Sequence, residues 1–100
     1  MTSSIGESVE PSSVPVHGEH VSTAEFEGET VLYDAAVCRP VLLNVSAAAV
    51  WATIDGRRSV AEIAASVAAA FGADPAAVMP DVTATVARFE ALGLLTVSPP

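Results

Sequence analysis

The sequence predicts an α+β domain in which three short antiparallel strands are followed by three helices. Residues 21–44 are rich in β-branched and aromatic side chains, and turn-forming residues divide them into short runs. From residue 45 onward, apolar side chains recur at the i, i+3, i+4 spacing of amphipathic helices. One hundred residues allow one domain with a modest core. We therefore expect a single change from strands to helices, within residues 43–59.

Residues 1–20 are predicted to be a flexible, acidic N-terminal tail, which leaves residues 21–97 as the folded domain. The tail is rich in serine and has few large apolar side chains, so burial cannot offset the entropy of ordering it. His17 and His20 stand near its end, but a metal site needs further ligands held in a fixed frame. We therefore predict no metal site.

Three runs of residues are predicted to be strands, at 21–26, 30–34 and 39–44. The first two are separated by a turn in which Gly28 can adopt a positive φ. Pro40 cannot donate a hydrogen bond to a neighbouring strand. The third strand is therefore expected to begin at this proline or to lie at the edge of the sheet.

The first helix is predicted to follow the third strand and to run to Ile54. Either Asn44 or Ser46 can cap it, because both side chains accept hydrogen bonds from backbone amides. Gly56 is expected to end this helix in a left-handed conformation. Trp51 can serve as the anchor of the core or stack on a ligand, and its helical spacing favours the core.

The second helix has the strongest local signals in the chain. Ser59 and Glu62 form a capping box, and Gly72 is expected to end the helix. Its apolar residues have the spacing of a core-facing stripe, and they are Val60, Ile63, Ala64, Val67 and Phe71.

The third helix is predicted to begin at Asp74 and Pro75 and to run to about Leu92. Pro80 interrupts the pattern, because proline lacks an amide and crowds the preceding turn. Either the helix kinks there, or a separate turn precedes a helix that starts at Pro80. Residues 94–97 then form a short strand or an extended tail.

The composition excludes several classes of function. The formal net charge is −8, and a negative surface repels nucleic-acid phosphates and anionic membranes. The N-terminus has no basic segment followed by an apolar run, as a secretory signal would. The most apolar window, residues 41–54, is too short to cross a bilayer. We expect a cytoplasmic protein without a nucleic-acid or membrane partner.

The sequence contains no recognisable catalytic constellation. Cys38 is the single cysteine, so it cannot form an intrachain disulfide. A cysteine nucleophile needs a base, and no histidine falls within the predicted folded domain. Neither a phosphate-binding glycine loop nor a cluster of metal ligands is present in the sequence. We therefore predict no catalytic residue and no cofactor, and interpret Cys38 as a small turn residue.

The predicted order of elements, with a glycine turn between the first two helices, is winged helix-turn-helix-like. Domains of this shape commonly place a helix in the major groove of DNA. The predicted third helix, however, has one basic residue, Arg88, and two acidic residues, Asp81 and Glu90. The one basic pair, Arg57 and Arg58, lies in the turn between helices, where a solvated turn explains it about as well as a phosphate contact. DNA binding or another protein-interaction role remains the alternative.

The edge of the third strand offers a second kind of site. An extended peptide can add to an open sheet edge through main-chain hydrogen bonds, or a second copy can pair there to form a homodimer. Side chains of neighbouring β-strand residues alternate between the two faces, so Val41 and Leu43 share one face and Leu42 the other. On the third helix, a shoulder beside the core stripe consists of Met79, Thr83 and Val86. These residues either line a groove or complete the core.

A set of short motifs, taken in order and with their spacing, resembles the PqqD family of peptide chaperones. The motifs span residues 43–95 and are Leu43-Asn44, Ser46-Ala47-Ala48, Val50-Trp51, Asp55-Gly56, Arg58-Ser59-Val60-Ala61-Glu62-Ile63, Phe71-Gly72, Asp74-Pro75, Asp81-Val82 and Leu92-Gly93-Leu94-Leu95. The resemblance as a whole covers residues 30–95. It implies a non-catalytic recognition element for ribosomally synthesised and post-translationally modified peptides.

The resemblance also implies where a ligand binds and which partners take part. The leader segment of a precursor peptide would add as a strand along Val41, Leu42 and Leu43. It would contact the third helix at Met79, Thr83 and Val86. The implied partners are the precursor peptide and a modifying enzyme, often a radical SAM maturase in this family.

Overall fold

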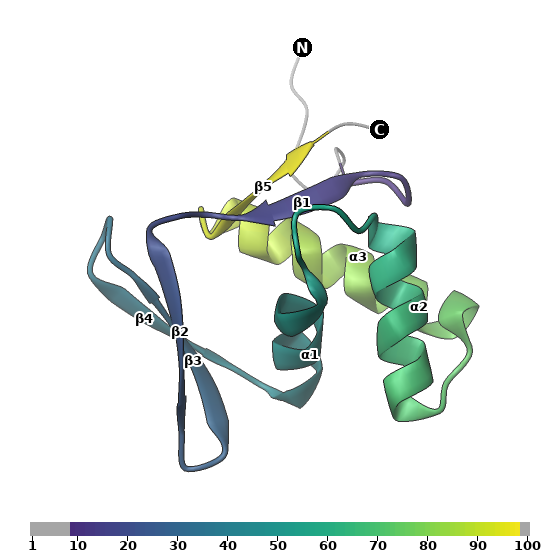
Figure 1. Cartoon of the computed structure of the whole chain (residues 1–100), viewed down its shortest axis with the longest axis horizontal. Helices are drawn as coiled ribbons and strands as arrows, with labels where there is room; N and C mark the ends of the chain where they lie inside the picture. The colour runs from purple at the N-terminus through teal and green to yellow at the C-terminus, as the bar shows by residue number, and fades with distance from the viewer. Residues whose placement is uncertain (1–8, 99–100) are drawn as a thin grey trace.

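The computed structural model describes residues 9–98, which contain two small antiparallel sheets and three helices (Figure 1). In chain order the elements are β1 (Val14–His17), β2 (Val21–Phe26), β3 (Glu29–Asp34), β4 (Arg39–Leu43), α1 (Val45–Thr53), α2 (Val60–Phe71), α3 (Pro75–Ala91) and β5 (Leu95–Ser98). The predicted α+β class with antiparallel strands and three helices is confirmed. The prediction of only three strands is wrong, because β1 and β5 form a second sheet.

The three predicted strands form one meander, in the order β2–β3–β4. β2 and β3 are joined by a two-residue turn in which Glu27 and Gly28 both have positive φ, of 52° and 83°. Positive φ at both positions is the signature of a type I′ turn, whose twist matches that of the flanking strands. The predicted hairpin is therefore present, and β4 pairs with the other side of β3.

The segment before β2 is part of the fold, contrary to the prediction of a flexible tail through residue 20. β1 pairs with β5 over four residues each. The carbonyl oxygens of Ser13 and Pro11 accept hydrogen bonds from the amides of Val60 and Ala61, both 2.9 Å long. These amides belong to the first turn of α2, where backbone N–H groups have no hydrogen-bond acceptor within the helix. Residues 1–8 of the predicted tail lie outside the described residues.

The cap of α1 is Asn44, whose side chain accepts a hydrogen bond of 2.8 Å from the amide of Ala47. The Ser46 hydroxyl donates to the Asn44 side chain, so it supports this cap. The helix ends before the glycine predicted to end it, because the cap residue Ile54 is already extended. Gly56 adopts its positive φ two residues later, in the turn towards α2.

α2 and α3 follow the predicted boundary signals. The capping box of Ser59 and Glu62 is complete, and Gly72 ends α2 in the left-handed conformation. α3 runs without a break through Pro80, so the alternative of a separate turn is ruled out. The prediction that Phe71 faces the core is wrong: it is 49% exposed, because the last turn of α2 reaches past the core, and it borders a pocket beside α3.

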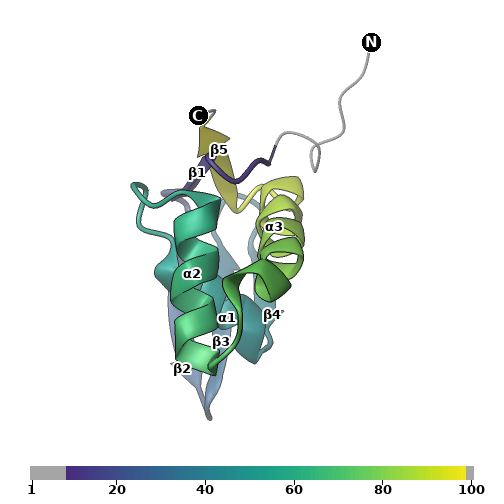
Figure 2. The ribbon, with the colours of Figure 1, turned by 90° about the vertical axis from the view of Figure 1, so that its right-hand side faces the viewer.

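The core lies where the three helices meet the inner face of the β2–β3–β4 sheet, and α1 lies between that sheet and the α2–α3 pair (Figures 1 and 2). Trp51 is 3% exposed, and its ring meets Phe89 edge-on at 5.1 Å. The prediction that Trp51 anchors the core is confirmed. Of the described helices, none alone is long and apolar enough to cross a membrane; only α2 and α3 taken together meet that criterion, and they are bent by 119° at their junction.

Candidate functional site

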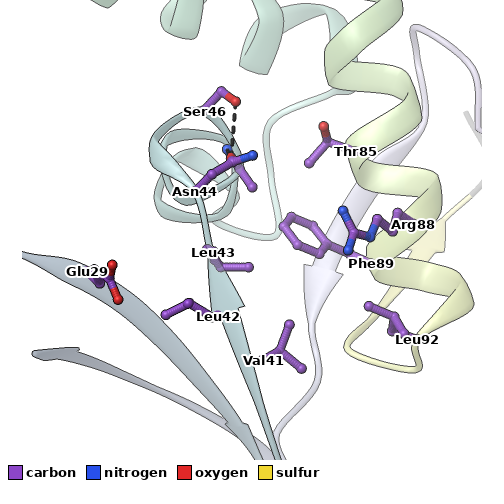
Figure 3. Close-up of a pocket in the computed structure, with 11 residues that line it drawn as sticks. Glu29, Val41, Leu42, Leu43, Asn44, Ser46, Thr85, Arg88, Phe89 and Leu92 are labelled. Atoms are coloured by element: carbon purple, nitrogen blue, oxygen red, sulfur yellow. Dashed lines mark hydrogen bonds between the residues drawn. The ribbon is translucent and has the colours of Figure 1, made fainter.

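A groove of about 410 Å³ separates β4 from α3 and reaches the first turn of α1 (Figure 3). Its walls come from segments about 45 residues apart in the sequence, so only the tertiary fold brings them together. The residues lining it are Glu29, Val41, Leu42, Leu43, Asn44, Ser46, Ala47, Thr85, Arg88, Phe89 and Leu92.

The backbone of β4 has an open edge along this groove. Opposite residues in an antiparallel ladder alternate between hydrogen-bonded and non-hydrogen-bonded pairs. Pro40 lies opposite Tyr33 and has no N–H, so we assign this pair as non-hydrogen-bonded. Val41 then bonds to β3, and Leu42 does not. The N–H and C=O of Leu42 therefore point to the open edge.

The β2–β3 hairpin leads independently to the same assignment. Its two-residue turn makes Phe26 and Glu29 the closing hydrogen-bonded pair. From there, alternate residues of β3 direct their backbone groups to β2, and Tyr33 is one of them, opposite Ser22. Tyr33 thus has its backbone hydrogen bonds with β2, which agrees with a proline facing it on β4.

The side chains of β4 divide between the groove and the outer face of the sheet. Leu43 is buried and Val41 is half-buried, and both belong to the inner face with Phe89 beneath them. Leu42 is 62% exposed on the outer face. The groove therefore has an apolar floor beside a backbone edge that offers one donor and one acceptor at Leu42.

A polar cluster fixes the end of the groove nearest the start of β4. The buried carboxylate of Asp34 lies 3.7 Å from Nε2 of His20 and 4.0 Å from Nη2 of Arg39. The same nitrogen atoms donate to carbonyl oxygens at the end of α3: His20 to Gly93 at 2.9 Å and Arg39 to Leu92 at 3.0 Å. Through these contacts the sheet is tied to α3, which sets the width of the groove.

Of the predicted peptide-binding residues, the three on β4 line the groove and the three on α3 do not. Val86 is fully buried, Met79 packs against the core, and Thr83 is half-buried. Val86 belongs to the core stripe itself. Because successive helical residues are rotated by about 100°, Met79 and Thr83 lie on the side of this stripe that faces away from β4. The flank facing β4 carries the residues that sequence reasoning missed as site residues, namely Thr85, Arg88, Phe89 and Leu92.

The two histidines have structural roles in the folded part of the chain. His17 stacks on Trp51 with ring centroids 3.8 Å apart, and its Nε2 donates to the Trp51 carbonyl oxygen. Burial lowers the pKa of His17, although that hydrogen bond acts in the opposite direction. Among residues 9–98, no three His, Cys, Asp or Glu side chains come together as a set of metal ligands.

The basic pair between α1 and α2 closes a turn. The amides of Arg57 and Arg58 donate to the Asp55 carboxylate at 2.9 and 2.8 Å, which lowers the pKa of that carboxyl group. The Arg58 guanidinium also donates to the carbonyl oxygen of Thr53. These contacts account for the Arg58 side chain, whereas the Arg57 side chain is exposed.

The model of the family described as "Coenzyme PQQ synthesis protein D (PqqD)" matches residues 29–95. The chain belongs to the PqqD family. The matched segment begins at β3 and ends at the first residue of β5, so it contains every residue that lines the groove. A search of curated proteins finds no match.

Three solved structures share this fold. The PqqD truncation of Methylobacterium extorquens PqqCD, described as a functional, stand-alone RiPP recognition element, has 27% identity and a TM-score of 0.77, over 91% of this chain and 97% of that one. "Lasso peptide synthetase B1 complexed with the leader peptide" has 20% identity and a TM-score of 0.71, over 82% and 96% of the two chains. TbiB1 in complex with the TbiA(beta) leader peptide has 19% identity and a TM-score of 0.70, over 79% and 92%.

Proposed function

We propose that this protein is a non-catalytic recognition module that binds the leader segment of a ribosomally made precursor peptide. The leader adds to β4 as a fourth strand of the β2–β3–β4 sheet and is presented to an enzyme that modifies the remainder of the precursor. The observation that carries this proposal is the open edge of β4 at Leu42, next to a groove with an apolar floor. Main-chain hydrogen bonds supply affinity in this mode of binding, and side-chain pockets supply specificity.

Membership of the PqqD family and the likeness to a stand-alone recognition element support this function. Two further proteins of the same fold are described as bound to leader peptides. Their sequence identity to this chain is 20% and 19%, so the likeness shows a shared fold only. The related PqqD is a part of PqqCD, which supports a modifying enzyme as the second partner. A radical SAM maturase is the enzyme that we propose from the family resemblance.

Three finer points belong to the same proposal. We propose that the arrangement of helices and β-hairpin is winged-helix-like without binding nucleic acid, since the net charge of −8 repels phosphates. We propose a cytoplasmic location, where a ribosomal precursor is made. A second copy of the chain could also pair with the β4 edge, so a homodimer would compete with the leader for the same backbone groups.

The test is binding of a fluorescein-labelled leader peptide, taken from a precursor gene identified by its position next to this one, measured by fluorescence anisotropy. Leu42→Pro removes the one amide that β4 offers at its open edge but no hydrogen bond to β3. We expect it to weaken binding about tenfold, about 1.4 kcal/mol, from the lost hydrogen bond and the proline ring at the edge. Leu42→Ala keeps the amide and should bind within about twofold of the original protein.

Two more variants separate a lost site from a lost fold. Thr85→Trp leaves β4 unchanged and fills the groove from α3, so it should also weaken binding. Val41→Pro removes an amide that bonds to β3 and is expected to destabilise the sheet, whereas Leu42→Pro should keep the circular dichroism spectrum. If folded Leu42→Pro and Thr85→Trp both bind the leader unchanged, the peptide does not occupy this groove.

A further inference from the structure

The groove carries a charge that nothing else in the described structure neutralises. Among the residues that line it, Arg88 is the one cation and Glu29 the one anion. In Figure 3 the Arg88 guanidinium extends from α3 towards β4, beside the Phe89 ring, whereas Glu29 lies on the far side of β4. Glu29 is therefore not placed to pair with Arg88.

Of the other three arginines, two have ion-pair partners, and the third, Arg57, is exposed in a turn outside the groove. Arg39 pairs with Asp34, and Arg58 pairs with Asp55. Within residues 9–98, the Arg88 side chain is exposed and forms neither an ion pair nor a hydrogen bond. Arg88 lies in the last turn of α3, where a cation stabilises the helix dipole, and the Arg39 guanidinium also reaches this end at the Leu92 carbonyl. A free guanidinium in an acidic protein is thus directed at the proposed path of the peptide.

The geometry of strand addition decides which peptide residues face this guanidinium. A residue paired with Leu42 has its side chain on the outer face, as Leu42 does, so its two neighbours point inward. One neighbour lies opposite Leu43 and the other opposite Val41. In Figure 3, Leu43 is level with Arg88 and Phe89, and Val41 is level with Leu92.

The spacing of the two elements agrees with this placement. Inward residues of a strand are about 6.6–6.8 Å apart along the chain, and Arg88 and Leu92 are separated by four residues of helix, about 6 Å. The distance between two successive inward side chains of the peptide therefore matches the distance along α3 from Arg88 to Leu92. An antiparallel peptide, the more stable pairing, passes Arg88 first.

We propose that Arg88 is a specificity-determining residue, which selects a peptide carrying an aspartate or glutamate two residues before an apolar residue. The carboxylate pairs with the Arg88 guanidinium, and the apolar side chain lies between Val41 and Leu92. This inference rests on the proposed function and adds to it the chemistry of the bound segment. An arginine–carboxylate pair also fixes the register, because the guanidinium presents two parallel donors to the two oxygen atoms.

The test uses phage-displayed random 12-residue peptides, selected on the immobilised full chain and counter-selected on Leu42→Pro, so that only peptides needing the β4 edge remain. The enriched peptides are expected to share an acidic residue two positions before an apolar one. Selection on Arg88→Glu should replace the acid by lysine or arginine. For one enriched synthetic peptide, acid→Lys should weaken binding about fivefold or more, and Arg88→Glu should restore it.

A matched control separates the groove from the charge of the whole protein. Arg57 is exposed and lies outside the groove, so Arg57→Glu makes the same change in net charge. It should leave the selected motif unchanged. Enriched peptides without an acidic preference, or an equal effect of Arg57→Glu, would overturn the role of Arg88 while peptide binding at β4 stands. Failure to enrich any peptide that depends on the Leu42 amide would count against the proposed function and this inference together.

Discussion

At the scale of single residues, His17 joins the N-terminal strand to the core. Its ring lies almost parallel to that of Trp51, at an interplanar angle of 9°, and its Nε2 donates to the Trp51 carbonyl at 3.0 Å. The indole Nε1 of Trp51 donates in turn to the Thr23 hydroxyl on β2. β1, α1 and β2 therefore meet at one tryptophan, which follows His17 by 34 residues and Thr23 by 28.

This arrangement makes the stability of the fold depend on pH near neutrality. Burial holds the pKa of His17 below its ordinary value of 6.5, so the unfolded chain binds a proton more readily than the folded one. The contribution of His17 is complete above pH 6.5 and is lost as the pH falls below it. Urea unfolding at a series of pH values between 7.5 and 5.5 should show a declining free energy of unfolding.

The variant His17→Phe is the control for this prediction. It keeps an aromatic ring over Trp51 and removes the titrating group, so its stability should change less over the same pH interval. An equal pH dependence in the variant and the original protein would show that another group is responsible.

At the scale of elements, two prolines have opposite consequences in α3. Pro75 is the first residue of the helix, where its missing amide would have no helical partner. Pro80 lies inside the helix and removes the hydrogen bond that residue 80 would make to the carbonyl of Ala76. The helix persists there because its apolar face is packed against the core at Val82, Val86 and Phe89.

Replacing Pro80 should therefore stabilise the protein. Pro80→Ala restores the missing hydrogen bond and is expected to raise the free energy of unfolding by about 1–3 kcal/mol. Pro80 is exposed and lies outside the groove, so leader binding should not change. The measurement is urea unfolding with Pro75→Ala as the control, which should change stability by less than about 0.5 kcal/mol. Equal effects of the two substitutions would contradict the argument.

Elements also show why only the β4 half of the predicted site lines the groove. Sequence periodicity identified the core stripe of α3 and the alternation of β4, and both are present. The core stripe of α3 has a flank on each side, however, and the helical repeat does not show which flank faces β4. Which flank faces β4 depends on how α3 is oriented on α1 and the sheet, so periodicity could not show that Arg88 lines this groove and that Met79 does not.

At the scale of the whole molecule, the segment before β2 encloses one end of the fold. β1 pairs with β5, Ser13 is buried, and its carbonyl oxygen caps α2. Figure 1 shows β1 and β5 side by side over the ends of the helices. The domain therefore extends well before residue 21, where the sequence placed its beginning.

Truncation tests this boundary. A chain beginning at residue 21 loses the β1–β5 ladder, the His17 stack and two amide partners of α2, and should lose at least about 3 kcal/mol of stability. A chain beginning at residue 9 keeps every contact described above and should be more stable than the shorter chain by that amount. Equal urea midpoints for the two truncated chains would show that β1 contributes little.

The sequence by itself determined what depends on neighbouring residues. Several features are local, because each depends on side chains and backbone groups within a few residues. They are the β2–β3 hairpin, the capping box of Ser59 and Glu62, the glycine that ends α2 and the order of short motifs. Local order was also enough to indicate the family. The choice between Asn44 and Ser46 as a cap already needed the structure, because both are suitable by type.

Only the tertiary structure decided what depends on residues distant in the chain. β1 is a run of only four residues, and it is held by backbone pairing with a strand about 80 residues away and by the start of α2. The groove exists because Asp34, His20 and Arg39 tie the sheet to the end of α3. Such contacts leave no periodic pattern, since the energy of each pair arises between segments that meet only when the chain has folded.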